Sequence, residues 1–303
     1  MNNTRTAVAA LAAAAALLAT ACAPDQADAA SPDAIDVSTA PIPTPVADDL
    51  TALEKTYDAR LGLFVLDTST GRSVTWRSDE RFAFASTIKA PLSGAVLDRV
   101  SQRDLSRVIR FTAQDLVPYS PVTEQHVDDG MTLRAIMDAA LRFSDNTAAN
   151  LLYAEIGGPD GLDRALDRVG DRVTDPERLE PDLNTAIPGD VRDTTTPQAL
   201  ARTVGTYVTG TALPRRDRAL LRTMMVNNTT GDALIRAGVP DGWVVADKTG
   251  SADYGVRNDV AVLFPPRRSP VLIAVMSSRD GQDDTSDDAM IAEATRIAIG
   301  ALG

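Results

Sequence analysis

Strand patterns occur only near the two ends of this 303-residue chain, and this placement restricts its fold more than any other feature. Short β-rich runs bounded by turn residues lie at 61–66, 74–76, 243–246, 259–264 and 271–277. From Ser86 to about Leu234 the apolar residues recur mainly at helical spacing. Helices are also predicted at 47–59 and 287–302. The middle of the chain is therefore helical, and β-structure comes from both ends.

One antiparallel sheet built from both chain ends is the economical packing of these elements. We predict an α/β protein of the α+β type, in which helices flank that sheet and an all-helical subdomain is inserted. The sheet part is expected to span about 47–84 and 236–303, and the helical part about 85–235. A functional site is expected in the cleft between the two parts.

The first 46 residues lie outside this predicted catalytic domain of residues 47–303. Residues 1–22 have a weakly basic start and an alanine-rich apolar run, which is typical of an export signal. Residues 23–46 are rich in Ala, Asp, Pro, Ser and Thr, which predicts a flexible linker. Cys22 ends the apolar run as the lipid-attachment cysteine of a lipoprotein does, and the alternative is simple cleavage near Ala29. We favour the lipoprotein, and either way predict an exported protein, secreted or anchored to the cell envelope.

Composition argues against several functions. The net charge of −12 opposes binding to nucleic acid, and we interpret it as a solubilising surface. Only one histidine is present, His126, which argues against a metal-dependent hydrolase with several histidine ligands and against a Ser-His-Asp triad. One cysteine cannot form a disulfide within the chain. We predict no metal, no cofactor, a small-molecule partner and, by default, a monomer.

Lysine is rare, and its positions are informative. Only Lys55, Lys89 and Lys248 are lysines among 30 basic residues. A desolvated amine gives up its proton far more readily than a guanidinium, so a retained lysine can act as a base. Lys55 lies in a polar run and is predicted at the surface, whereas the other two lie in motifs.

The first motif is Ser86-Thr87-Ile88-Lys89, at the start of an apolar helical run. The positive N-terminal field of a helix stabilises an oxyanion, and a lysine at i+3 faces the same side as the serine. Pro91 removes one backbone hydrogen bond early in this helix. By itself the pattern is a weak signal, usually that of a helix cap and a surface lysine.

The second motif is Ser144-Asp145-Asn146, between two helical runs. A hydroxyl and a carboxamide there can relay protons and hold a substrate amide. By itself the motif is a capping turn.

The third motif is Lys248-Thr249-Gly250-Ser251, expected to follow a strand. An ammonium and hydroxyls bind carboxylates, and glycine lets a ligand approach the backbone. Arg257 adds a forked anion contact from the next strand. The alternative is a basic turn after a strand.

The fourth motif is the acidic, proline-rich loop of residues 175–193. A long irregular loop inside a compact domain is usually functional or disordered. Glu180 is a candidate base and Asn184 a candidate to hold its water. Arg178 and Asp193 are expected to close the loop by an ion pair. A solvated charged loop is the alternative.

The first three motifs, in this order along one domain, resemble the class A serine β-lactamases, of which they are the signature. The fourth, from Arg178 to Asn184, matches the Ω-loop signature of the same family. The resemblance extends from about residue 47 to the C-terminus and implies the β-lactamase/transpeptidase-like fold. It implies that Ser86 is the nucleophile, activated with Lys89, and that Ser144 passes a proton to the leaving nitrogen. Glu180 would drive a water, positioned with Asn184, onto the acyl-enzyme. Whether Lys89 or Glu180 is the acylation base stays open.

The resemblance also implies the substrate contacts. The amides of Ser86 and Ser251 would form the oxyanion hole, Asn146 would bind the substrate side-chain amide, and Tyr119 would be the aromatic residue at the cleft mouth. The ring carboxylate would be held by Lys248, Thr249, Ser251 and Arg257, with Gly250 between them. The Glu180-Pro181 bond is a candidate for the cis form.

Departures from the family are limited. Ala85 and Met137 stand where many relatives have a disulfide, so that bridge is absent. Ala252 replaces a cysteine found in some carbapenem-hydrolysing members, which argues against that one route to carbapenem hydrolysis.

Three rival functions are compatible with parts of the pattern. A penicillin-binding protein or D,D-peptidase shares the serine and the lysines but lacks the counterparts of Glu180 and Asn184. A penicillin sensor domain would need a transmembrane segment and a signalling domain. A generic serine esterase would need neither Glu180 nor Asn184, and we favour it least.

Overall fold

The computed structural model describes residues 43–302. The predicted export signal at 1–22, including Cys22, and all but the last four residues of the predicted linker at 23–46 lie outside the described residues. Within residues 43–302, no helix combines the length and the apolarity needed to cross a membrane.

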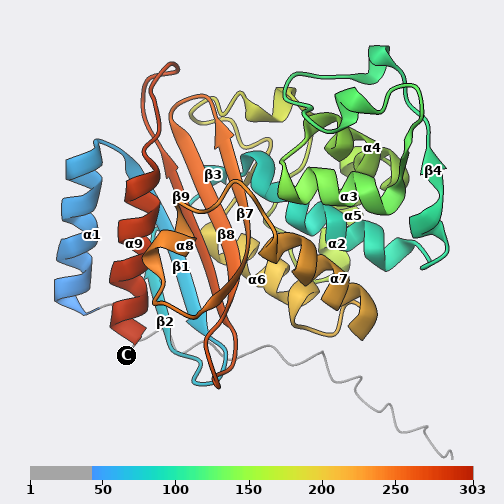
Figure 1. The fold of residues 1–303 in the computed structure, drawn as a ribbon. Helices are drawn as coiled ribbons and strands as arrows, with labels where there is room; N and C mark the ends of the chain where they lie inside the picture. Colours follow the sequence, from blue (N-terminus) through green and yellow to red (C-terminus); the bar gives the residue numbers. More distant parts are fainter. Residues whose placement is uncertain (1–42, 303) are drawn as a thin grey trace, which may run out of the picture. The chain divides into compact units, whose positions relative to one another are not determined.

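A five-stranded antiparallel sheet forms the centre of the domain, in the order β2-β1-β9-β8-β7 (Figure 1). Its strands are β1 (Arg60–Asp67), β2 (Ser73–Trp76), β7 (Val244–Ala252), β8 (Val256–Phe264) and β9 (Val271–Ser278). Every neighbouring pair is antiparallel. The N-terminal part of the chain supplies two strands and the C-terminal part three, which confirms the predicted fold class.

Helices cover both faces of the sheet because its inner strands are apolar on both sides. α1 (Thr44–Tyr57), α8 (Ile235–Gly238) and α9 (Asp288–Leu302) pack on one face, and α6 (Pro197–Val208) contacts the other (Figure 1). Side chains alternate between the two faces of a strand. In β1, Leu63 and Val65 belong to the hydrophobic cluster under α1 and α9, whereas Phe64 and Leu66 join the cluster of the helical part.

The remaining elements form the helical part next to the free edge of β7. Its helices are α2 (Lys89–Arg99), α3 (Leu133–Arg142), α4 (Asn146–Ile156), α5 (Gly158–Arg168) and α7 (Arg215–Val226). The short 3-10 turns are η1 (Ala85–Ile88), η2 (Asp104–Ser106), η3 (Ala113–Asp115), η4 (Thr123–Gln125) and η5 (Asp182–Asn184). Two small strand pairs join β3 (Phe82–Ala83) to β6 (Thr194–Thr195) and β4 (Val108–Ile109) to β5 (Met131–Thr132).

Several predicted boundaries are wrong, among them the start of β8, which lies at Val256 rather than at residue 259. The 248–251 motif lies inside β7 rather than after it, because β7 pairs with β8 as far as Ala252. α1 begins at Thr44, three residues before the predicted start. Pro45 lies in the first turn of that helix, where its missing N–H removes no helical hydrogen bond.

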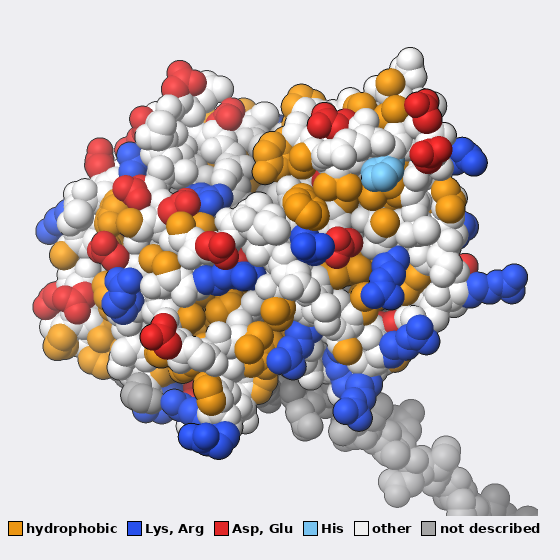
Figure 2. Space-filling model, in the orientation of Figure 1, with side chains coloured by type: hydrophobic (Ala, Val, Ile, Leu, Met, Phe, Trp, Pro, Cys, Tyr) orange, Lys and Arg blue, Asp and Glu red, His pale blue; other side chains and the backbone are white. Residues whose placement is uncertain are grey.

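Acidic and basic side chains are interspersed on the face shown in Figure 2, where the single histidine lies near the upper right edge.

Candidate active site

Ser86 lies in the 3-10 turn η1, and Lys89 is the first residue of α2. Residues i and i+3 of a 3-10 turn eclipse each other, so Lys89 Nζ lies 2.8 Å from Ser86 Oγ. Ala85, directly before the serine, has a left-handed φ of 48°, which costs conformational energy for a non-glycine residue. Pro91 lies in the first turn of α2, where no intrahelical donor is lost. The serine and the lysine are thus held together by the local backbone.

The Ser144-Asp145-Asn146 segment joins α3 to α4 and also serves the site. Asp145 is the N-cap of α4, as the capping-turn interpretation predicts. Lys89 Nζ donates to Ser144 O at 2.7 Å and to Asn146 Oδ1 at 2.6 Å. Lys248 Nζ donates to Ser144 Oγ at 3.0 Å. Ser144 therefore lies between the two buried lysines.

Glu180 is almost fully buried and faces the serine and the lysine from the 175–193 loop. Its Oε1 lies 3.0 Å from Lys89 Nζ and 3.4 Å from Ser86 Oγ. Its Oε2 accepts a hydrogen bond from Asn184 Nδ2 at 2.5 Å. The Glu180-Pro181 bond is cis. Among the described residues, no hydrogen-bond partner contacts the buried Asn184 Oδ1.

Asn150 is a site residue that the sequence reasoning missed. It lies on α4, one turn after Asn146, and its side chain binds both the carbonyl and the N–H group of Glu180. Asn150 Nδ2 donates to Glu180 O at 2.8 Å, and the Glu180 N–H donates to Asn150 Oδ1 at 2.9 Å. Its spacing of four residues from Asn146 was the available signal, because such residues share a helix face.

An ion pair closes the 175–193 loop between Arg178 and Asp193, as expected. Asp193 is buried and also accepts the backbone N–H groups of Glu177 and Arg178, both at 3.0 Å. This carboxylate therefore fixes the start of the loop against its end.

Burial controls the protonation of the two lysines. Desolvation lowers the pKa of Lys89, and the nearby Glu180 carboxylate partly raises it again. Desolvation, followed by the positive charge of Lys89, lowers the pKa of Lys248 to about 7. Both amines are therefore closer to the neutral form than an exposed lysine.

Strand β7 approaches the backbone at Ser86 closely. A Cβ atom placed on Gly250 would lie 3.0 Å from Phe84 O and 3.2 Å from Ser86 N. Such contacts are tighter than side chains normally allow, so glycine lets the edge strand lie directly against the turn that carries the serine.

The far end of β7 carries the remaining predicted anion contacts. Ser251 pairs with Arg257 of β8, and Arg257 Nη1 donates to Ser251 Oγ at 2.7 Å. Arg257 Nε also contacts Asp288 Oδ1, at the start of α9, at 2.5 Å. Thr249 Oγ1 lies 2.6 Å from Thr230 Oγ1.

Tyr119 is 61% exposed, consistent with a position at the rim. Its carbonyl accepts the N–H of Asn146 at 3.0 Å, and Asn146 Nδ2 donates to Pro118 O at 2.9 Å. The segment carrying the aromatic residue is thus fixed to the start of α4.

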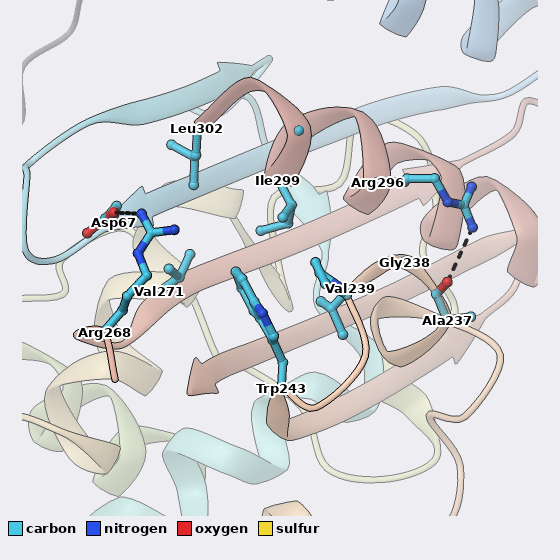
Figure 3. A pocket seen from close by; sticks show the side chains of 12 residues that line it. Asp67, Ala237, Gly238, Val239, Trp243, Arg268, Val271, Arg296, Ile299 and Leu302 are labelled. Carbon is cyan, nitrogen blue, oxygen red and sulfur yellow. Dashed lines mark hydrogen bonds and ion pairs between the residues drawn. The ribbon is translucent and has the colours of Figure 1, made fainter. Parts of the chain in front are cut away.

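A separate cavity of about 480 Å³ lies between the α8–β7 connection, the start of β9 and the C-terminal end of α9 (Figure 3). Its walls include Trp243, Val271 and Ile299, with Arg268 and Arg296 at its sides. None of the four motifs contributes to it. Within residues 43–302, no group of three or more His, Cys, Asp or Glu side chains is arranged to hold a metal ion.

The site brings the Ser86 hydroxyl, two buried lysines and a buried carboxylate together beside edge strand β7, an arrangement that suits acyl transfer by a serine enzyme. The family model described as the β-lactamase enzyme family matches residues 45–302. The chain belongs to the β-lactamase family, and within it to the class A serine enzymes.

Two curated relatives have similar sequences. The β-lactamase of Bacillus licheniformis is 54% identical over 259 residues, which cover 86% of this chain and 84% of the relative. The β-lactamase of Amycolatopsis lactamdurans is 55% identical over 258 residues, covering 85% of each chain. Among solved structures, a class A β-lactamase from Clostridium kluyveri DSM 555 is 44% identical with a TM-score of 0.85, covering 86% of this chain and 99% of that one.

Proposed function

We propose that Ser86 carries the β-lactamase reaction through a covalent acyl-enzyme. Ser86 Oγ attacks the carbonyl carbon of the β-lactam ring, and its proton passes to a base. The carbon–nitrogen bond of the ring breaks, and Ser144 delivers a proton to the nitrogen. The amides of Ser86 and Ser251 hold the oxyanion of the intermediate. The 3.0 Å contact between Lys248 Nζ and Ser144 Oγ supports a proton path at this position.

Glu180 then drives deacylation. It takes a proton from a water as that water attacks the ester carbonyl. The bond between the carbonyl carbon and Ser86 Oγ then breaks, and Glu180 returns the proton to Ser86 Oγ, which releases the serine and a substituted β-amino acid. One observation carries this step: Glu180 Oε1 lies 3.4 Å from Ser86 Oγ while its Oε2 is held by Asn184. The unpartnered Asn184 Oδ1 supplies a second acceptor for the same water.

Two bases are in reach for the acylation step, and the distances favour neither exclusively. Lys89 Nζ lies nearer the serine hydroxyl, at 2.8 Å, and its lowered pKa suits proton abstraction. Glu180 Oε1 contacts both Lys89 and Ser86, so it accepts the proton directly or through the lysine.

Substrate binding follows from the same arrangement. We assign the ring carboxylate to Lys248, Thr249, Ser251 and Arg257, and the side-chain amide of the antibiotic to Asn146. Tyr119 borders the mouth of the site. The enzyme is proposed to act on β-lactam antibiotics as an exported monomer. Mass spectrometry of the mature N-terminus distinguishes lipidation at Cys22 from simple cleavage.

Steady-state hydrolysis of a chromogenic cephalosporin by the purified protein tests the function. Turnover far beyond one equivalent, abolished by Ser86→Ala, is expected. A burst of one equivalent that then stalls would instead identify a penicillin-binding protein or sensor.

The deacylation step needs a second experiment. Glu180→Ala is expected to acylate and then remain acylated, because a positioned general base contributes roughly 10² to 10⁴ in rate. Intact-protein mass spectrometry after substrate addition detects the adduct. Glu177→Ala, which removes an exposed carboxylate from the same loop, is the matched control and should turn over normally. Rapid turnover by Glu180→Ala would remove Glu180 from the mechanism.

A further inference from the structure

A chain of hydrogen bonds runs from a buried ion pair behind β7 to the hydroxyl of Thr249. Arg236 Nε donates to Asp247 Oδ1 at 2.8 Å, and Asn228 Nδ2 donates to Asp247 Oδ2 at 2.6 Å. Asn228 Oδ1 accepts from the backbone N–H of Thr230 at 3.1 Å and from its hydroxyl at 2.9 Å. Thr230 Oγ1 lies 2.6 Å from Thr249 Oγ1. Of these residues only Thr249 belongs to one of the four sequence motifs.

The orientation of the Asn228 amide is fixed by its neighbours. A backbone N–H only donates, so the group of Asn228 that faces Thr230 must be its oxygen. The amine therefore faces Asp247, which accepts it and is itself held by Arg236. Asn228 and Asp247 are both buried. A Cβ atom on Gly231 would lie 2.0 Å from Asp247 Oδ2, so there is little room for another arrangement.

Each threonine hydroxyl has one proton to donate. While Thr230 donates to Asn228 Oδ1, the short contact with Thr249 requires Thr249 to give its proton to Thr230. Thr249 then offers only lone pairs to the cleft. A carboxylate is also an acceptor and gains nothing from such a hydroxyl.

Rotation of the Thr230 hydroxyl reverses this direction. If Thr230 donates to Thr249, the Thr249 proton is free for a ligand anion. Asn228 Oδ1 remains satisfied, because it keeps the backbone N–H of Thr230. The neutral hydrogen bond from Thr230 to Asn228 Oδ1 is exchanged for one from Thr249 to the ligand anion. A hydrogen bond to a charged group is the stronger kind.

We propose that Thr230 is a positioning residue, whose hydroxyl turns from Asn228 to Thr249 and directs the Thr249 proton to the substrate carboxylate. The inference rests on the proposed function of Thr249 as a carboxylate contact. Thr230 acts through Thr249 and needs no contact of its own with the substrate. Asp247 and Arg236 hold the side chain of Asn228, whose Oδ1 is the acceptor that the Thr230 hydroxyl leaves.

A double-mutant cycle tests the proposal, with Thr230→Val, Thr249→Val and the double variant assayed on a penicillin. Thr230→Val leaves the Thr249 proton free but removes the neutral hydrogen bond from Thr230 that orients the Thr249 hydroxyl. We therefore expect kcat/KM to fall about fivefold through a higher KM, the size of one neutral hydrogen bond. In the Thr249→Val background the same change should cost less than twofold. On the methyl ester of the same penicillin, which lacks the anion, the Thr230→Val loss should also be less than twofold.

Matched variants separate positioning from folding. Thr229→Val removes the neighbouring hydroxyl, which donates to Arg142 O, and should leave KM unchanged. Thr230→Ser keeps the hydroxyl and should restore KM. Thermal denaturation checks every variant, and Thr230→Ala replaces Thr230→Val should the valine variant not fold.

Two failures are distinguishable. If Thr249→Val leaves KM for the penicillin unchanged, the proposed contact between Thr249 and the carboxylate is wrong, and the inference about Thr230 falls with it. If Thr249→Val raises KM but Thr230→Val has no effect, or an equal effect in both backgrounds or on the ester, only the inference is overturned.

Discussion

Asn150 offers a direct test of how the helical part positions Glu180, the proposed general base. Asn150→Ala removes both side-chain hydrogen bonds to the backbone of Glu180, at 2.8 and 2.9 Å. A buried polar group left unpaired costs about 1 to 3 kcal/mol. Asn150 is half-buried, so water partly replaces it, and we expect a loss of about 2 to 3 kcal/mol in unfolding free energy. For a domain of this size the melting temperature should fall by about 4 to 12 °C.

The kinetic consequence should be specific. A displacement of about 1 Å in a positioned group costs on the order of 10² in rate, so deacylation should slow by about that factor. If Lys89 is the acylation base, its 2.8 Å contact with Ser86 Oγ does not involve Asn150, and acylation should slow much less; an equal loss in both steps would assign both to Glu180. Stopped-flow measurement of the burst and of the steady rate separates the two steps.

A control and a refuting result complete this test. Asn227→Ala removes an exposed asparagine whose side chain donates only to Thr223 O, one turn earlier, and should change neither stability nor kinetics appreciably. If Asn150→Ala lowers the melting temperature while both steps keep their rates, Asn150 stabilises the fold without positioning Glu180, and the reasoning is wrong.

Three further predictions concern charge and close packing. Burial lowers the pKa of Lys248 to about 7, so its positive charge is present below that pH, and kcat/KM for carboxylate substrates should fall as pH rises through 7. Lys248→Arg stays charged and should not show this fall at alkaline pH; an unchanged pH profile in the variant would contradict the assignment. Arg178→Ala leaves the buried Asp193 without its cation and should lower the free energy of unfolding, measured in urea, by about 3 to 5 kcal/mol. Arg192→Ala breaks a more exposed pair in the same loop and should lower it by less than about 1 kcal/mol; equal losses would refute the distinction. Gly250→Ala places a methyl group against the backbone at the serine and should reduce kcat/KM at least tenfold. Gly300→Ala, which has open space around it in α9, should leave stability unchanged or raise it by up to about 1 kcal/mol. Full activity of Gly250→Ala would show that β7 and the turn carrying Ser86 separate freely.

Much of the fold was predictable because it depends on local patterns. The apolar runs that became β1, β8 and β9 are continuous, as expected for strands buried on both faces, and their positions near the chain ends implied a sheet closed by both termini. The boundaries at Thr44 and Ala252 were not predictable in this way. Pro45 interrupts the apolar pattern at the start of α1, and the polar residues of β7 resemble a turn until β8 pairs with them.

The sequence by itself determined the contacts that need only short spacing. Ser86 and Lys89 meet because three residues make one tight turn, and Asp145 caps the helix that it precedes. The order of the motifs also indicated the family. Tertiary structure decided the rest: how closely the Glu180 carboxylate approaches the serine, which side chain holds the backbone of Glu180, and which hydroxyl lies beside Thr249. These contacts join residues that lie 19 to 94 positions apart in the chain, so they arise from the packing of whole elements, and spacing along the chain does not name the partner of each residue.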